Sequence, residues 1–417
     1  MTRPAFLSGL VAGVLALALS CAAQAQEAPA AQAPAASPAA PAAAAQPALQ
    51  DFTIGYVELA DDPRYNEDYA YARIQLRPLG RAFSGAELGL ADGQQIGRVI
   101  GANFKLARKE GTSVDELSAT IREWVGQGVH FVVADLPAAS LLALADSVSG
   151  EPVLLFNATA PDDNLRAGDC RANVAHIYPS YLMLTDALTQ YLAVRKWLEI
   201  LVLQGPLPED AALVQALERS AQRFGAEISD VRPFLLTNDP RMRDQSNVAL
   251  LTAGADYDVV YVADSDGEFG RYVPYQTNAP RPVVGTTGLV ADAWHWSWER
   301  QGAPQVNSRF EQLAGRRMTG QDWGAWIAIK AVVQGVLRSK STEFTAIRDF
   351  LFSDRLNLDG TKGSPMSFRA WDHQLRQPLL VTTQNAVIER PPLEGFLHQT
   401  NDLDTLGADE PETECRF

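Results

Sequence analysis

The sequence lacks the short motifs of common catalytic and nucleotide-binding sites. It contains no G-x-S-x-G elbow, no H-E-x-x-H pair, no C-x-x-C, no Walker loop and no G-x-G-x-x-G after a predicted strand. This absence favours a binding protein over an enzyme. Because a catalytic site needs no local motif, an exported enzyme stays as the rival class.

Positive charge and long apolar runs are also scarce. The formal net charge is −15, and such a surface repels nucleic acid and anionic lipid, so neither is expected as a partner. The one apolar run of note is Phe6–Leu19, which follows Arg3 and precedes a small-residue exit at Ala25. This pattern predicts a signal peptide over residues 1–25 and export to the periplasm, with no membrane span in the mature chain.

Cysteine is rare, with three in the chain. Cys21 lies in the signal and resembles a lipoprotein cleavage site, but Ala18 stands where that site prefers leucine, so we expect cleavage after Ala25 and not lipid tethering. In an oxidising compartment, Cys170 and Cys415 form either a disulfide or two separate thiols, and we expect the disulfide. Two cysteines without a neighbouring histidine or cysteine cluster predict no metal site, and no cofactor is expected.

What the sequence does contain is a strand–helix alternation. Residues 26–50 are almost all Ala, Pro and Gln and predict a linker. The remaining length exceeds one comfortable core and predicts two lobes. Continuous apolar strands, which are typical of parallel sheets covered on both faces, alternate with amphipathic helices. The predicted strands are 52–58, 104–109, 129–134, 152–156, 198–203, 228–235, 257–263 and 282–285, and the predicted helices between them are 113–125, 181–196, 209–224 and 242–253.

The order of elements changes after Gly302. Residues 304–314, 322–337 and 342–352 are predicted as helices, the second of them buried because it is apolar almost all round. Two short strands, 366–370 and 377–382, follow, and the second is predicted to form a hairpin with 385–388.

This order resembles the type I periplasmic binding proteins, particularly the branch that binds branched-chain amino acids. The likeness rests on segments 84–92, 126–133, 157–162 and 366–372. It implies an α/β fold, a two-lobed clamshell in which each lobe is a mainly parallel sheet flanked by helices, with three interlobe crossings. We expect lobe 1 to comprise 51–178 plus 300–373, lobe 2 to comprise 179–299 plus 376–398, and 399–417 to form an acidic tail.

A narrower resemblance adds a functional implication. Segments 285–289, 294–299 and 301–304 are similar to binding proteins associated with PQQ-dependent alcohol dehydrogenase systems. It implies a periplasmic solute-binding protein that serves an ABC transporter linked to alcohol oxidation, with a small-molecule ligand and ABC permease subunits or periplasmic dehydrogenase components as partners. An accessory or sensory ligand-binding protein of the dehydrogenase system, with no transport role, is the alternative.

In such a fold the ligand lies between the lobes at the carboxyl ends of the strands. Amino-acid-binding relatives hold the ligand carboxylate with hydroxyl residues after the third and fourth strands. Thr159 matches the second, but Ala138 replaces the first, and Thr286 and Thr287 stand where an acid is expected, which argues against a branched-chain amino acid. Aromatic residues, namely a tyrosine cluster (Tyr56, Tyr65, Tyr69 and Tyr71) and Trp294, Trp296 and Trp298, favour an apolar or aromatic ligand, although such residues more often pack in cores. The candidate ligand-binding residues are Pro137, Ala138, Asn157, Ala158, Thr159, Gln204, Asp264, Ser265, Thr286, Thr287 and Trp294.

Overall fold

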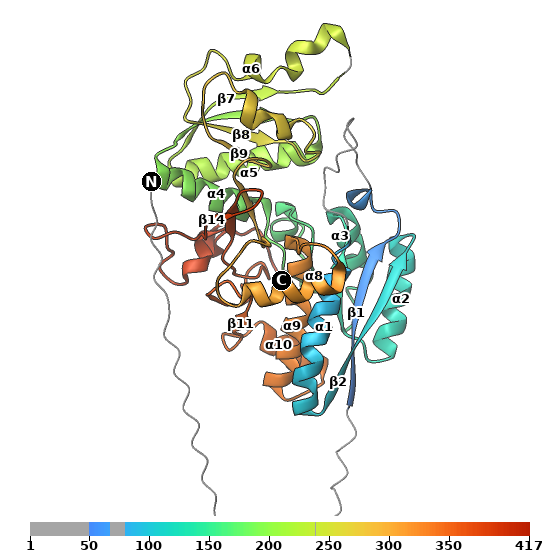
Figure 1. The fold of residues 1–417 in the computed structure, drawn as a ribbon. Helices are drawn as coiled ribbons and strands as arrows, with labels where there is room; N and C mark the ends of the chain where they lie inside the picture. Colours follow the sequence, from blue (N-terminus) through green and yellow to red (C-terminus); the bar gives the residue numbers. More distant parts are fainter. Residues whose placement is uncertain (1–49, 67–79, 238) are drawn as a thin grey trace, which may run out of the picture. The chain divides into compact units, whose positions relative to one another are not determined.

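The computed structural model describes residues 50–66, 80–237 and 239–417, and two parallel β-sheets organise them (Figure 1). The predicted signal peptide and all but the last residue of the predicted linker lie outside this description. The strands are β1 Gln50–Leu59, β2 Ala102–Gly111, β3 Phe131–Asp135, β4 Leu154–Asn157, β5 Val174–His176, β6 Glu199–Gln204, β7 Glu227–Pro233, β8 Val259–Ala263 and β9 Val283–Gly285. The first sheet has the order β2-β1-β3-β4-β5 and the second has the order β7-β6-β8-β9.

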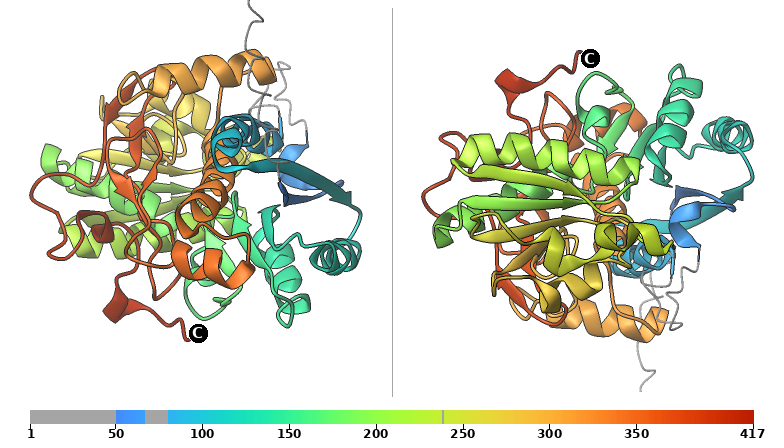
Figure 2. Two further views of the ribbon diagram at one scale, coloured as in Figure 1. Left: turned by 90° about the horizontal axis from the view of Figure 1, so that it is seen from below. Right: turned by 90° about the horizontal axis from the view of Figure 1, so that it is seen from above.

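Each sheet is buried on both faces, which explains the continuous apolar runs. In β6, Ile200 and Val202 face one hydrophobic cluster while Leu201 and Leu203 face another. Side chains of successive residues in a strand point to opposite faces, so both faces of this strand need apolar residues. Figure 2 shows helices on both faces of the second sheet.

The helices divide between the two sheets. We call the first sheet and the helices packed with it lobe 1, and the second sheet with its helices lobe 2. Lobe 1 contains α1 Phe83–Ile100, α2 Val114–Gly126, α3 Ala138–Ser147, α8 Ala303–Ala314, α9 Gly320–Ser339 and α10 Phe344–Leu351, and lobe 2 contains α4 Tyr181–Arg195, α5 Pro208–Phe224, α6 Val248–Leu251 and α7 Val273–Gln276.

Helix α9 is the central helix of lobe 1, and α1 packs against it through glycines. A methyl group at Gly89 would lie 2.8 Å from Cβ of Ile329, and one at Gly93 would lie 2.8 Å from a methyl carbon of Val333. These distances are shorter than van der Waals contact, so α1 reaches α9 only because these positions lack a side chain. The capping box of Thr319 and Asp322 fixes where α9 begins.

Two small antiparallel sheets complete the fold. Strands β10 Val290–Asp292, β13 Leu380–Thr382 and β14 Val387–Glu389 form one, and β11 Leu358–Asp359 pairs with β12 Pro365–Met366 in the other. The pairing of β13 with β14 confirms the predicted hairpin. The chain passes from lobe 1 to lobe 2 after β5, returns after β10 and passes again before β13.

Two local predictions differ from the structure, and one helix was not predicted. The predicted helix 242–253 is a 3₁₀ segment, Pro240–Ser246, followed by the short α6, because the Asn247 side chain accepts a hydrogen bond from the Leu250 amide and starts a new helix. The strand predicted at 366–370 is reduced to the pairing of Pro365–Met366 with β11 and a single antiparallel bridge between Phe368 and Leu375. Helix α3 was not expected. None of the helices within the described ranges combines the length and the hydropathy needed to cross a bilayer.

Candidate functional site

The carboxyl edge of the first sheet holds a guanidinium group between two acids. Arg64 lies in a short 3₁₀ turn, Pro63–Tyr65, that follows β1, and Asp62 caps this turn. The Arg64 Nη2 atom donates to Asp62 at 2.6 Å and to Asp135 at 2.9 Å, and its Nη1 atom donates to the Thr159 hydroxyl at 2.9 Å. The side chains of both acids are fully buried, while that of Arg64 is 29% exposed. Arg64 is therefore fixed by buried groups but accessible to a small molecule.

Asp135, the last residue of β3, is the centre of this cluster. Its carboxylate also accepts hydrogen bonds from the hydroxyl of Tyr65 at 2.7 Å and from that of Tyr56 at 3.1 Å. Burial, together with the charge of Asp135, raises the pKa of both tyrosines well above its ordinary value. Both hydroxyls therefore stay protonated and donate to the carboxylate.

A second ion cluster supports the first from β1. Glu58 is fully buried and contacts Arg81 at 3.3 Å and Arg108 at 2.5 Å. Burial raises the pKa of Glu58, while the two arginines oppose this shift. Arg81 also stacks over the Tyr65 ring at 4.9 Å, so the two clusters are in contact.

In the turn after β4, backbone amides donate to a side chain of the same turn. The Asn157 side-chain oxygen accepts from the backbone amides of Thr159 at 3.3 Å and Ala160 at 2.9 Å. Ala158 is fully buried beneath α9, where Gly324 approaches its carbonyl oxygen. These two amides are therefore already used and are not offered to an anion, while the Thr159 hydroxyl oxygen accepts from Arg64.

The other sequence-predicted residues lie at the carboxyl ends of the strands as well. Pro137 precedes α3, and its carbonyl accepts from Leu141, while Ala138 is the first residue of that helix. In lobe 2, Gln204 ends β6, and Asp264 accepts from the Gly270 amide at 2.6 Å. Burial raises the pKa of Asp264, which this amide opposes.

Three further lobe 2 positions contact neighbouring segments. The backbone amide and the hydroxyl of Ser265 both donate to Asp210, at 2.7 and 2.6 Å. The Thr286 hydroxyl accepts from the Asp264 amide at 3.1 Å, and Thr287 lies against Gly270. The structure thus gathers the predicted residues into two groups, one at the carboxyl edge of each sheet.

A further carboxylate lies beside the chain passages. Asp292, on β10, accepts a hydrogen bond from Tyr178 at 3.1 Å, and Gln321 at the start of α9 reaches the same tyrosine hydroxyl at 3.4 Å. Burial raises the pKa of Asp292 to about 6 and, with the charge of Asp292, raises that of Tyr178 well above its ordinary value.

Trp294 does not lie with either group. It is 1% exposed, its ring stacks on Trp323 with centroids 6.3 Å apart, and its indole N–H donates to Asn307 at 3.0 Å. Its apolar surface is therefore used in the lobe 1 core. Trp296 is more accessible, and Arg317 stacks on its ring at 3.4 Å.

Several sequence signals fall outside the description or elsewhere in the fold. Tyr69 and Tyr71 lie outside the described residues. Within the described ranges, no group of three histidine, cysteine, aspartate or glutamate side chains is arranged to hold a metal ion. A pocket of about 530 Å³ lies at the opposite edge of the first sheet, between the start of β1, Pro152 and Phe344. Ligands of parallel sheets bind at the carboxyl edge, so this pocket is not the candidate site.

Sequence reasoning missed Arg64 and Asp135. Asp135 directly follows the apolar run of β3, and a charged residue at the carboxyl end of a buried strand was a usable signal. Nothing local marked Arg64, because its partners are separated from it by up to 95 residues.

Comparison with solved structures assigns the fold. No protein-family model and no curated protein sequence matches the chain. The leucine-, isoleucine-, valine-, threonine- and alanine-binding protein of Brucella ovis is similar, with a TM-score of 0.67 and 14% identity over 88% of this chain and 99% of that one. The fold is that of the type I periplasmic binding proteins. The branched-chain amino acid ABC transporter ligand-binding protein of Burkholderia xenovorans LB400 has a TM-score of 0.66 and 13% identity over 87% of this chain and 98% of its own.

One similar structure holds an aromatic acid. The R. palustris ABC transporter solute-binding protein in complex with benzoate has a TM-score of 0.60 and 10% identity, covering 88% of this chain and 99% of that chain. These comparisons confirm the predicted two-lobed α/β clamshell.

Proposed function

We propose that this protein captures a small molecule between its two lobes in the periplasm and delivers it to an ABC transporter. The observation that carries the proposal is the placement of two polar groups at the carboxyl edges of two parallel sheets, which is where α/β folds bind ligands. Solute-binding proteins of similar fold support it, since their chains are covered almost completely.

The ligand that we propose is not a branched-chain amino acid. The backbone amides of Thr159 and Ala160 already donate to the Asn157 side chain, Ala138 offers no hydroxyl, and the Thr159 hydroxyl oxygen already accepts from Arg64. A hydrogen bond to a charged group is worth about 1.5–3 kcal/mol, so each lost donor weakens carboxylate binding about tenfold or more. Arg64 is an accessible donor of lobe 1, and the two carboxylates of Asp62 and Asp135 more than offset its single positive charge. This environment suits an uncharged oxygen better than a carboxylate.

The link to PQQ-dependent alcohol oxidation is part of the same proposal and rests on the resemblance of segments 285–289, 294–299 and 301–304. The alternative is an accessory or sensory protein of a periplasmic alcohol dehydrogenase system without a transport role. The two differ in a deletion strain. Loss of uptake of the bound compound favours transport, and normal uptake with impaired alcohol oxidation favours the accessory role.

A thermal-shift screen of the mature protein tests the binding function. Matched pairs of probes, benzyl alcohol against benzoate and isoamyl alcohol against isovalerate, differ in the replacement of an alcohol by a carboxylate. Leucine, valine, 3,4-dihydroxybenzoate and aldehydes complete the panel. A ligand at 100 times its Kd stabilises the folded state by about 2.7 kcal/mol. We expect the uncharged member of a pair to raise the Tm. Stabilisation by leucine or valine contradicts the ligand assignment, and turnover of any hit contradicts the binding function.

A further inference from the structure

The last residues of the chain join both lobes. We call residues 399–417 the C-terminal strap. Near its middle, the Gly407 amide donates to Asp186 of α4 at 2.7 Å, and Arg223 of α5 donates to the Gly407 carbonyl at 2.8 Å. Arg223 also contacts Glu412 at 2.5 Å. Because Asp186 is fully buried, this is an interior anchor on lobe 2.

A second anchor lies on the third passage between the lobes. Arg369, which is 1% exposed, donates to Asp404 at 2.9 Å and to the Leu406 carbonyl at 2.6 Å. Arg376 donates to the same carboxylate at 2.8 Å. Two arginines of the passage therefore bind one acid of the strap.

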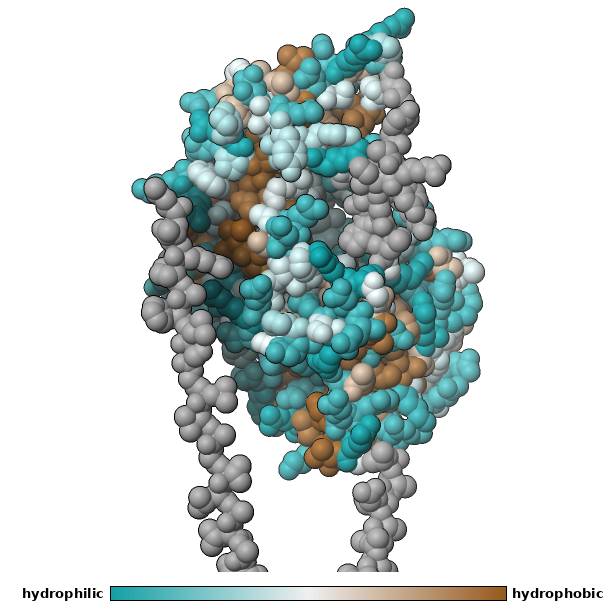
Figure 3. Space-filling model, viewed as in Figure 1, coloured by the Kyte–Doolittle hydropathy of each residue, from teal (hydrophilic) through white to brown (hydrophobic). Residues whose placement is uncertain are grey.

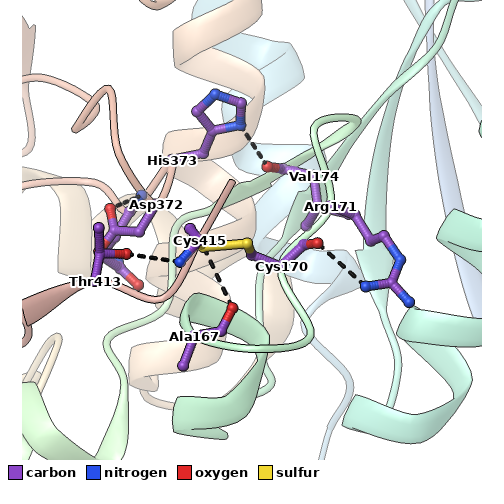
Figure 4. The surroundings of a disulfide bond; sticks show 9 residues. Ala167, Cys170, Arg171, Val174, Asp372, His373, Thr413 and Cys415 are labelled. Carbon is purple, nitrogen blue, oxygen red and sulfur yellow. Dashed lines mark hydrogen bonds between the residues drawn. A yellow bond between two sulfur atoms is a disulfide. The ribbon is translucent and has the colours of Figure 1, made fainter. Parts of the chain in front are cut away.

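The third anchor, on lobe 1, is covalent. Cys415 and Cys170 form a disulfide with their Cα atoms 5.7 Å apart, in a loop that precedes β5 (Figure 4). The Phe417 ring stacks on His373 with centroids 4.0 Å apart. Figure 2 shows the end of the chain beside this part of lobe 1.

The passages themselves are joined by buried polar side chains. Lys362, fully buried, donates to the Ala293 carbonyl and to Gln377, both at 2.9 Å, and Gln377 donates to the Ile177 carbonyl at 2.6 Å. These contacts connect all three passages, which marks them as the axis about which the lobes rotate.

The strap is fixed at separate points and does not pack as a continuous layer. A pocket of about 120 Å³ lies between strap residues Ala408 and Thr413, lobe 1 residue Arg166 and lobe 2 residues Ser180 and Arg219. Rotation of the lobes changes the separation of the Asp186 and Cys170 anchors. A fully extended chain spans about 3.5 Å per residue, which sets the largest distance that the segment from Gly407 to Cys415 can cover. Its Cys415 end is held by a covalent bond and cannot dissociate when the lobes separate.

We propose that the C-terminal strap, fastened by the Cys170–Cys415 disulfide, limits how far the two lobes can open. This role goes beyond solute capture and does not depend on which ligand is bound. A narrower range of open states lowers the conformational cost of closing on a ligand.

Single-molecule energy transfer between dyes on the two lobes tests this proposal. Val99 of α1 and Tyr275 of α7 are 85% and 87% exposed and accept Val99→Cys and Tyr275→Cys labels. In the ligand-free, disulfide-bonded protein we expect one narrow distribution. In Cys170→Ser/Cys415→Ser we expect a new population at lower transfer efficiency. Superposition of the two distributions, with native circular dichroism in both, overturns the proposal.

A second variant keeps the disulfide intact. Arg223→Lys retains the positive charge beside Asp186 but loses the forked guanidinium group, whose nitrogen atoms also reach the Gly407 carbonyl and Glu412. It should shift the distribution in the same direction, and it decides the question if the cysteine variant fails to fold. The matched control, Arg348→Lys, alters an exposed pair with Asp349 and should change nothing. Shifts of equal size in both lysine variants also overturn the proposal.

Discussion

The Arg64 cluster makes a quantitative prediction for Arg64→Leu. This change removes the cation between Asp62 and Asp135, whose side chains are fully buried, and leaves two carboxylates unpaired. Breaking a buried ion pair by removing one partner costs about 3–5 kcal/mol. The Arg64 side chain is 29% exposed, so water screens part of the lost interaction, and we expect the lower end, about 3 kcal/mol at pH 7. Asp135 keeps the hydrogen bonds from Tyr56 and Tyr65, which preserve its position.

Urea unfolding followed by circular dichroism measures this loss as a lower midpoint at unchanged m value. Arg348→Leu, which breaks an exposed pair, is the control and should cost less than about 1 kcal/mol. A loss below about 1 kcal/mol at pH 7, or an equal loss in the two variants, would refute the reasoning.

Three further predictions concern the framework. Gly89→Ala should destabilise lobe 1 by about 1–3 kcal/mol in urea unfolding, because the new methyl group would meet Ile329 and the Trp326 carbonyl. The control Gly126→Ala places its methyl group in open space and should not destabilise the protein. Equal effects of the two changes would contradict the close packing of α1 on α9. Burial raises the pKa of Asp186 to about 6, so between about pH 4 and 6 the folded chain binds more protons than the unfolded chain. The stability of the wild type should therefore increase relative to that of Asp186→Asn as the pH falls through this range. A difference in Tm between the two proteins that does not depend on pH would contradict this prediction. The disulfide joins residues with a sequence separation of 245. The lost constraint on the unfolded chain predicts that Cys170→Ser/Cys415→Ser lowers the free energy of unfolding by about 5 kcal/mol. A decrease of less than about 1 kcal/mol would contradict this explanation.

Much of the fold follows from local patterns in the sequence. The strand now seen as β6 was predicted as 198–203 because both of its faces are apolar, and α2 was predicted from its Ser113 cap and its apolar stripe. The helix predicted at 242–253 failed because a periodic pattern cannot show that Asn247 interrupts it. The glycine contact between α1 and α9 also escaped notice, since it depends on helices more than 200 residues apart in the sequence.

The candidate site was predictable in place but not in composition. The positions after the strands follow from topology, and Thr159, Asp264 and Thr286 all lie there. Their hydrogen-bond partners come from distant segments, so the sequence could not show that Arg64 already binds the Thr159 hydroxyl. Trp294 was an error of the same kind, since an aromatic residue near a passage between lobes can face the core.

The repeated passages between the lobes also bear on the order in which the protein is made. Lobe 1 begins at β1, yet its central helix α9 starts only at Gly320, after the whole second sheet. Lobe 2 depends on late residues as well, since Val381 and Leu393 complete the hydrophobic cluster on one face of its sheet. Neither lobe can therefore complete its core until the last part of the chain is present. Cys415 arrives almost last, so the bond to Cys170 seals a nearly finished molecule and cannot guide its early folding.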